Sequence, residues 1–211
     1  MDGLLVDSEP LWHRAEAEIL GDLGVPIKRE GTRSTKGMFV SEVMRYWFDR
    51  FPWIGPSPQE VSEMVVDRVG ELTVAEGIIL PGARATVQAM AERGPIALAS
   101  STPKRLIAIV LDHIGLTSEF SIICSAEDED YGKPHPAVFL TAARTIGVDP
   151  THCVVFEDAP AGVLAAKAAR MVCVAVPEPS ERDRAEIALA DFVLETLEDL
   201  NHADLDVALQ R

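Results

Sequence analysis

The chain has 211 residues, 47% of them hydrophobic, and a formal net charge of −15 at pH 7. This length and composition fit a globular core, with or without a smaller insertion, and exclude a disordered chain. No apolar run reaches the roughly 18 residues that a membrane-spanning helix needs, and no basic segment leads into an apolar one at the start. Because nucleic acid requires a basic surface, the acidic net charge argues against nucleic acid as a partner. We also expect no membrane partner, a cytoplasmic location and a monomer.

The first residues, Met1-Asp2-Gly3, resemble the second half of a loop. An Asp-Gly pair followed by small apolar residues normally comes directly after a buried strand. Here no strand precedes the pair. If the loop carries chemistry, its most important residue lies upstream of Met1.

Residues 9–79 predict an all-helical block. Apolar residues recur at helical spacing from Leu11 to Leu23, and further helical patterns cover about 41–51 and 59–74, with no convincing strand among them. We therefore expect a helical cap at 9–79, inserted between an opening loop at 1–8 and a core at 80–211. Five aromatic residues of this block either line a ligand pocket or pack the cap's own interior, and packing is favoured: Tyr46, Trp47, Phe48, Phe51 and Trp53.

From residue 81 onward, short β-branched runs alternate with helical stretches. The expected strands are Ile96–Ala99, Phe120–Cys124, Cys153–Phe156, Val172–Val176 and Phe192–Leu194. The helical stretches carry stop signals at Gly94, Gly115 and Gly147. Nearly all-apolar strands that alternate with helices predict an α/β fold, a Rossmann-like parallel sheet covered on both faces.

Polar residues follow the first of these strands, at the sheet edge where ligands of parallel sheets bind. Ser100, Ser101 and Thr102 come directly after Ile96–Ala99. One of the three hydroxyls either caps the helix that begins near Lys104 or, with neighbouring backbone N–H groups, holds a phosphate oxygen.

An acidic pair, Glu157-Asp158, follows the third strand, and Lys133 stands between a glycine and a proline in the loop before it. Asp158 either N-caps the next helix or, with Glu157, binds a cation, because adjacent acids repel each other unless a positive charge compensates them. Acidic oxygen ligands beside a phosphate site suit Mg²⁺. Lys133 is either an ordinary exposed lysine or the group that neutralises a phosphoryl group.

The cysteines and histidines show no metal-binding pattern. Cys124, Cys153 and Cys173 stand singly in apolar runs and are expected to be buried free thiols. His135 either approaches a substrate or has a structural role in its proline-flanked turn.

Together these features resemble the haloacid dehalogenase superfamily, in the branch with a helical cap after the first loop, over essentially the whole chain. Members open with an apolar strand that runs into D-x-D-G, and Met1-Asp2-Gly3 matches x-D-G. Ser100 falls on the second motif, Lys133 on the third and Glu157-Asp158 on the fourth. Four motifs in order at strand ends make a specific signal.

The resemblance implies a phosphatase that uses Mg²⁺. The first Asp of the motif attacks phosphorus, and Asp2 protonates the leaving oxygen and later deprotonates the attacking water. Mg²⁺ is held by the first Asp, the backbone carbonyl of Asp2 and Asp158, with Glu157 close by or acting through water. Ser100, Ser101 and Lys133 bind the phosphate.

Within the branch, residues 1–12, 52–57 and 167–171 look very like the bacterial phosphatases of 2-deoxyglucose 6-phosphate or of hexitol phosphates. The expected substrate is therefore a small phosphorylated metabolite, a sugar or sugar-alcohol phosphate. The alternative is a mutase, because β-phosphoglucomutases share the fold and all four motifs.

Two departures favour hydrolysis over the mutase reaction. The mutases carry a His where Trp12 stands, and a phosphate-binding Arg about three residues after the equivalent of Gly37, where this chain has Val40. The related phosphatases also carry an Arg near this point, and here Phe39 takes its place. Lys36 is a possible substitute for that Arg.

By the same resemblance, the nucleophilic Asp and a strand of about five or six residues would precede Met1. A polypeptide that begins at Met1 is then expected to fold poorly and to lack appreciable phosphatase activity. Either the internal Met of D-M-D-G has been taken as a start, or the protein is a non-catalytic relative that binds a phosphorylated ligand. The three intact motifs favour the first explanation.

Overall fold

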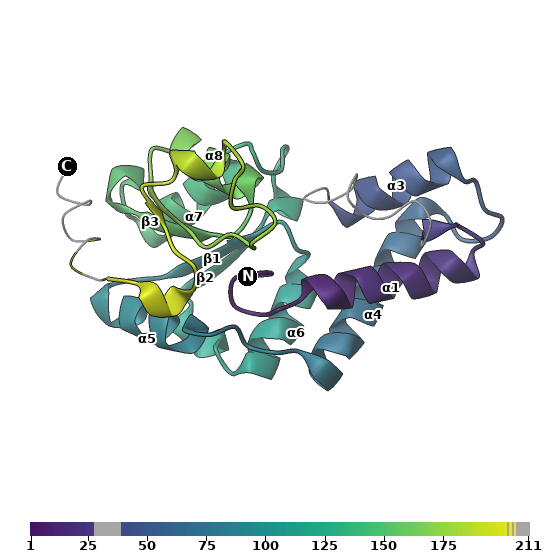
Figure 1. Cartoon of the computed structure of the whole chain (residues 1–211), viewed down its shortest axis with the longest axis horizontal. Coiled ribbons are helices and arrows are strands. Elements are labelled where there is room, and N and C mark those ends of the chain that lie inside the picture. Colours follow the sequence, from purple (N-terminus) through teal and green to yellow (C-terminus); the bar gives the residue numbers. More distant parts are fainter. Residues whose placement is uncertain (28–38, 202, 204, 206–211) are drawn as a thin grey trace.

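The structure, a computed structural model, describes residues 1–27, 39–201, 203 and 205. Helices α1 (Glu9–Asp22), α3 (Val40–Arg50) and α4 (Pro58–Glu76) pack together on one side of the molecule (Figure 1). These helices match the helical patterns expected in residues 9–79, and the described part of that block contains no named strand. The division into a cap at 9–79 and a core at 1–8 and 80–211 stays a prediction.

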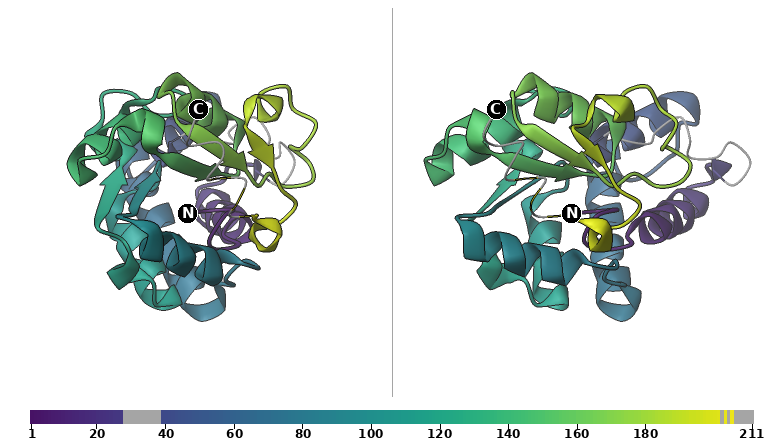
Figure 2. Two further views of the ribbon diagram at one scale, coloured as in Figure 1. Left: turned by 90° about the vertical axis from the view of Figure 1, so that its left-hand side faces the viewer. Right: turned by 60° about the vertical axis from the view of Figure 1, so that its left-hand side comes forward.

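The other side of the molecule is a layered α/β unit. Its strands are β1 (Ala97–Ser100), β2 (Ile122–Ser125), β3 (Val154–Glu157), β4 (Val172–Ala175) and β5 (Phe192–Val193). Its helices are α5 (Ala83–Arg93), α6 (Lys104–Ile114), α7 (Ala137–Ile146) and α8 (Pro160–Ala168). In the views of Figures 1 and 2, α5 and α6 lie on one side of the strands and α7 and α8 on the other. Both faces are therefore covered, as the apolar strands predict.

All five predicted strands are confirmed, with boundaries that differ by at most two residues, and every strand pair is parallel. They form two sheets instead of one, in the orders β1-β2 and β3-β4-β5. Within the described residues, β1 pairs with β2 alone and β3 with β4 alone. One edge of each of these two strands is therefore unpaired, and the α/β fold class holds with a divided sheet.

Three helices end at the predicted glycines. The residue after the last helical residue is Gly94 in α5, Gly115 in α6 and Gly147 in α7. Gly115 and Gly147 have φ angles of 64° and 73°, in the left-handed region that glycine adopts without the steric cost of a Cβ. The breaker residues thus end these helices by a local backbone preference.

The N-terminal segment folds into a tight turn near the strand ends. The carbonyl of Met1 accepts a hydrogen bond from the N–H of Leu5 at 2.8 Å. Two connections between the helical block and the α/β unit then run side by side, with Asp7 N–H donating to Ile78 O at 2.9 Å and Leu80 N–H donating to Leu5 O at 3.0 Å. This pairing fixes where the helical block joins the sheet.

The aromatic residues of the helical block mainly pack its interior, as predicted. Trp47 is fully buried and Trp53 is 8% exposed. The rings of Phe48 and Trp53 meet edge to face with centroids 4.8 Å apart, and Trp47 stacks on Phe51 at 6.1 Å. Such pairs add to the free energy that burial of their area supplies.

The three cysteines are free, as expected, with Cys124 and Cys173 buried and Cys153 only half-buried. Among the residues that the structure describes, no helix is long and apolar enough to cross a membrane.

Glu16 on α1 is a buried carboxyl, 8% exposed. Burial raises its pKa from an ordinary value of 4.5 to about 7, because the charged form loses water. Folding therefore favours the protonated side chain. The stability that this form provides is complete below pH 4.5 and is lost as the pH rises through about 7.

Replacing Glu16 with Gln should remove this pH dependence. We expect the free energy of unfolding of Glu16→Gln relative to the wild type to increase between pH 5 and pH 8, by at most about 3 kcal/mol. Urea titrations of both proteins at the two pH values measure the change. A difference that stays constant with pH would contradict the assignment of a raised pKa.

Candidate active site

Three side chains hold the carboxylate of Asp2 by donating hydrogen bonds to it. Ser8 Oγ donates to Oδ1 at 2.7 Å, and Trp12 Nε1 donates to the same oxygen at 3.2 Å. Thr102 Oγ1 donates to Oδ2 at 2.7 Å. Both carboxylate oxygens are therefore fixed by groups from the opening loop, from α1 and from the segment after β1.

Ser8 shows that this arrangement competes with local helix chemistry. It stands at the N-cap of α1, where serine usually accepts a hydrogen bond from the helix backbone. Here its side chain makes no capping bond, and its hydroxyl donates to Asp2 instead. The backbone of Thr102 is fixed by a second serine, because Ser125 Oγ donates a hydrogen bond to the Thr102 carbonyl at 2.7 Å.

The residues after β1 do not cap α6, so that alternative is wrong. The N-cap of α6 is Pro103, and it has no side-chain capping bond. The N–H of Lys104 donates instead to Glu127 Oε1 at 3.1 Å. Because a distant glutamate satisfies this helix end, the hydroxyls after β1 are left for other partners.

The two predicted phosphate-binding serines have different surroundings. Ser100 ends β1 and is 5% exposed, and its Oγ accepts a hydrogen bond from Thr102 N–H at 3.2 Å. Ser101 is half-buried and lines a pocket together with Lys133. Ser101 therefore faces the pocket, whereas the Ser100 hydroxyl is bonded to the backbone of Thr102.

Lys133 is not an ordinary exposed lysine. Its Nζ forms an ion pair with Glu157, the buried last residue of β3, and its side chain is 12% exposed. The same nitrogen lies 3.4 Å from the carbonyl oxygen of Ala99 and 4.7 Å from the ring centroid of Phe139. Lys133 therefore joins the carboxyl ends of β1 and β3.

Asp158 does not cap the following helix, because the N-cap of α8 is Ala159. A Cβ placed on Gly3 would lie 2.4 Å from Asp158 Oδ2, so this carboxyl almost touches the backbone of the Asp2-Gly3 loop. Burial raises the pKa of Asp158, and the neighbouring Glu157 raises it further; the Met1 amine and Lys133 act in the opposite direction. A half-buried acid that lies next to a second acid would be stabilised by a bound cation.

The donor set is suited to a hard cation such as Mg²⁺. Asp158 contributes a carboxyl for which no ion pair is found among the described residues, and Glu157 adds a second acid. The backbone of Asp2 and Gly3 lies against Asp158 and can supply a carbonyl oxygen. In the part of the chain that the structure describes, no three His, Cys, Asp or Glu side chains cluster as a complete metal site. The described carboxyls therefore fit the cation but do not enclose it.

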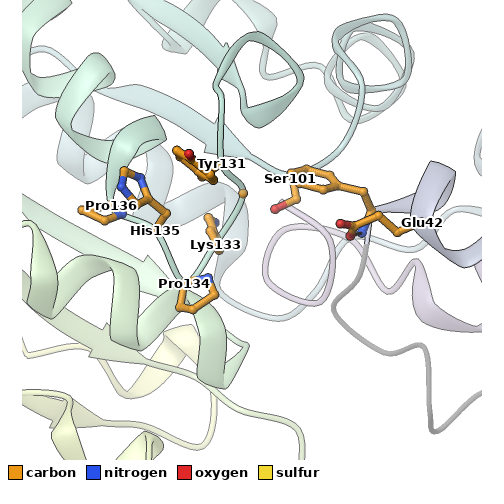
Figure 3. A pocket seen from close by; sticks show the side chains of 9 residues that line it. Glu42, Ser101, Tyr131, Lys133, Pro134, His135 and Pro136 are labelled. Carbon is orange, nitrogen blue, oxygen red and sulfur yellow. Dashed lines mark hydrogen bonds between the residues drawn. The ribbon is translucent and has the colours of Figure 1, made fainter.

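A pocket of about 490 Å³ opens beside Lys133, between the start of α3 and the loop that precedes α7. Figure 3 shows Ser101 and Glu42 on one side of this pocket and the Lys133 loop on the other. Its lining residues are Phe39, Glu42, Ser101, Tyr131, Gly132, Lys133, Pro134, His135 and Pro136. Residues from both parts of the molecule therefore meet at the site.

The sequence reasoning missed several of these residues. The position of Thr102 predicts a hydroxyl that either caps a helix or holds a phosphate oxygen, and it gives no sign of a bond to Asp2, one hundred residues away. Ser8 and Trp12 could have been suspected, because they stand within three turns of Asp2 on the same segment. Lys36 and Gly37 lie outside the described residues.

His135 lines the pocket, and its ring centroid lies 5.2 Å from that of Tyr131. Its Nδ1 also accepts a hydrogen bond from Ala137 N–H at 3.3 Å. Both predicted roles, next to a ligand and in its own turn, are compatible with this position.

A family model of haloacid dehalogenase-like hydrolases matches residues 1–170. Hexitol phosphatase B of Escherichia coli (strain K12) is 42% identical over 207 residues, which cover 97% of this chain and 93% of that protein. Fructose-1-phosphate phosphatase YqaB of the same organism is 30% identical over 183 residues, covering 83% and 93% of the two chains. The crystal structure of β-phosphoglucomutase from Clostridium difficile has the same fold, with a TM-score of 0.81 and 24% identity over 99% of this chain and 94% of that one.

Gly162 and Gly70 provide a test of how tightly Glu157 is held. A Cβ on Gly162, in the first turn of α8, would lie 2.1 Å from the Glu157 carboxyl carbon and Oε2. A Cβ on Gly70, within α4, would lie 3.1 Å from the flexible Ile109 Cδ1. Only the first would push a buried, paired carboxylate out of place.

We therefore expect opposite effects from the same substitution. Gly70→Ala should be neutral or should stabilise by up to about 1 kcal/mol, the usual gain of Ala over Gly in a helix. Gly162→Ala should lose about 1–3 kcal/mol, because the displaced Glu157 leaves Lys133 without its partner. Urea unfolding of both variants measures this, and equal stabilities would contradict the close contact.

Proposed function

The chain belongs to the haloacid dehalogenase-like hydrolases and is a phosphatase, and we propose that it hydrolyses the phosphate monoester of a sugar or sugar alcohol. The observation that carries this proposal is the convergence of an acid, Asp2, with Lys133 and Asp158 at one edge of the strands. The substrates in the names of two relatives, hexitol phosphatase and fructose-1-phosphate phosphatase, support the same class.

The reaction would proceed in two steps through an aspartyl-phosphate. The nucleophile would be an aspartate directly before Met1, whose carboxylate attacks phosphorus while the ester P–O bond breaks. Asp2 would give its proton to the departing alkoxide. Asp2 would then take a proton from the water that attacks phosphorus. This step releases inorganic phosphate, restores the carboxylate of the nucleophile and leaves Asp2 protonated for the next cycle.

The hydrogen bonds around Asp2 support its role in proton transfer by fixing the orientation of its carboxyl group. Ser8, Trp12 and Thr102 approach both oxygens and so fix the plane of the carboxyl group. A positioned carboxyl transfers a proton without first reorienting, which is the source of general acid–base rate gains.

Mg²⁺ would be held by Asp158, the backbone carbonyl of Asp2 and the upstream aspartate, with Glu157 close by or acting through water. When bound, it would stabilise negative charge on the oxygens of the transferring group. Lys133 would neutralise the phosphoryl group from the loop that precedes α7. Ser101 and Ser100 would bind phosphate oxygens together with the backbone that follows β1.

Trp12 supports hydrolysis over the alternative mutase reaction. Its Nε1 donates to Asp2 at 3.2 Å, and an indole N–H donates but does not accept protons. The mutases have a histidine at this position, which could exchange a proton with the acid. Trp12 can therefore orient Asp2 without taking part in proton transfer.

Replacing Asp2 with Asn should preserve its hydrogen-bonded position and remove the proton donor. In the chain extended upstream through its nucleophile, we expect kcat for a hexitol phosphate to fall about 10²- to 10⁴-fold. The loss should be smaller for p-nitrophenyl phosphate, whose leaving group needs no proton. Steady-state kinetics with Mg²⁺ measures both rates.

The matched control is Asp7→Asn, at an exposed acid five residues further along the same segment. It should leave both rates near those of the wild type. Robust turnover of the hexitol phosphate by Asp2→Asn would show that another group is the acid.

Extension of the chain upstream of Met1 tests the proposed nucleophile. We expect a polypeptide that begins at Met1 to show no appreciable hydrolysis. A polypeptide extended by an apolar strand that ends in Asp should hydrolyse sugar phosphates, and this hydrolysis should stop when EDTA removes the metal. The unpaired edges of β1 and β3 support a place for such a strand.

Two other results would change the proposal. Robust turnover by the polypeptide that begins at Met1 would exclude the upstream nucleophile. Binding of phosphate by the extended chain without turnover would favour the non-catalytic alternative. The codons in frame upstream of Met1 offer a first check, since an apolar run that ends in Asp is expected there.

A further inference from the structure

The wall of the pocket away from Lys133 comes from the start of α3. Phe39 is the N-cap of this helix, and Glu42 lies in its first turn. Among the described lining residues, Lys133 is the one lysine or arginine, and its charge already faces Glu157. The far end of the pocket therefore presents an aromatic ring and a carboxylate.

Phe39 makes a close contact across the pocket. A Cβ on Gly132 would lie 2.2 Å from two ring carbons of Phe39, so the ring rests directly on the Gly132 backbone. Gly132 is the residue before Lys133. Phe39 also packs against the apolar cluster that contains residues of β2, β3 and α7. The ring thus fixes the start of α3 against the loop that carries Lys133.

Glu42 is held by the same helix end. Its Oε2 accepts a hydrogen bond from the N–H of Phe39 at 3.0 Å, while the side chain remains exposed. Figure 3 shows Glu42 on the same side of the pocket as Ser101, and both residues line it. One carboxylate oxygen is thus anchored, and the group can still accept a hydrogen bond from a ligand.

This wall suits one kind of leaving group and opposes another. The hydroxyls of a sugar or sugar alcohol can donate to Glu42, and its C–H groups can pack on the Phe39 ring. A second phosphate at the far end would instead face the Glu42 carboxylate, and the described lining of this pocket adds no arginine or lysine there. The described lining of the pocket is therefore complementary to a neutral, hydroxylated end.

We propose that Phe39 and Glu42 are specificity-determining residues, which admit monophosphates with an uncharged polyol end and reject those with a second phosphate. This inference rests on the proposed function, because it assumes that the phosphate to be cleaved lies at Lys133. It assigns to the Phe39 ring and the Glu42 carboxylate a role in excluding a second negative charge.

The test compares mannitol 1-phosphate with mannitol 1,6-bisphosphate, which differ only in the second phosphate. In the extended chain with Mg²⁺, we expect kcat/KM to favour the monophosphate by about 100-fold. Glu42→Gln should reduce this ratio about tenfold, mainly by lowering KM for the bisphosphate. Phe39→Arg should reduce it at least as much, because it adds a cation.

Two further variants separate charge from packing. Phe39→Leu should keep the ratio and raise KM for both substrates, since it removes the ring but adds no charge. Glu60→Gln is the matched control for Glu42→Gln: Glu60 accepts from the N-cap N–H of α4 in the same way, at 2.7 Å from Ser57 N, and lies outside the pocket lining. It should leave the ratio unchanged.

The possible failures are distinguishable. A wild-type ratio near one, or equal ratios in Glu42→Gln and Glu60→Gln, would overturn the specificity inference while leaving the phosphatase intact. Failure of the extended chain to hydrolyse either mannitol phosphate or p-nitrophenyl phosphate would overturn the proposed function itself. Calorimetry with the two mannitol phosphates, on an extended chain whose nucleophile is Asn, should show the same order of affinities.

Discussion

The carboxylate of Asp2 is the point at which separate parts of the chain are joined. Ser8 and Trp12 approach one oxygen and Thr102 the other, so the opening loop, α1 and the end of β1 meet at a single group. This junction lowers the stability of the start of α1, because the hydroxyl of Ser8 bonds to Asp2 and does not cap the helix. Local rules tend to be broken at functional sites, where another interaction compensates. The N-terminal turn, the first helix and the second motif therefore depend on one another's position.

Charge is distributed around that point with little excess positive charge. Glu157 pairs with Lys133 and is largely neutralised, whereas Asp158 lies beside it, partly buried and without an ion-pair partner among the described residues. An acid that is partly withdrawn from water and lies beside a second acid is unfavourable, so a cation bound there would stabilise the site. In a protein with a net charge of −15, the proposed phosphate site would therefore depend for its attraction on one lysine and a bound cation, and not on the charge of the surface.

Residues that lie at strand ends could be predicted from the sequence, and residues that meet across the chain could not. Ser100 and Glu157 end β1 and β3, and apolar runs followed by polar residues were enough to locate them. The helix-cap alternatives for the residues after β1 and for Asp158 failed because Glu127 and Ala159 occupy those helix ends, which no local pattern reveals. The contact of Phe39 with Gly132 and the bond of Thr102 to Asp2 join residues about one hundred positions apart. The burial of Glu16 could not be predicted either, because glutamate is rarely buried and the helical pattern does not indicate that this side chain points inward.

The helical block reaches the chemistry through two contacts. Trp12, on α1, donates to the proposed acid Asp2, and Phe39, before α3, rests on the residue next to Lys133. The paired connections at Leu5–Asp7 and Ile78–Leu80 are the covalent links between the same two parts. A rotation of the helices about these links would therefore change the surroundings of Asp2 and of Lys133 together. If Phe39 and Glu42 select the substrate and Asp2 transfers the proton, as proposed, then one movement of the helices would affect both steps.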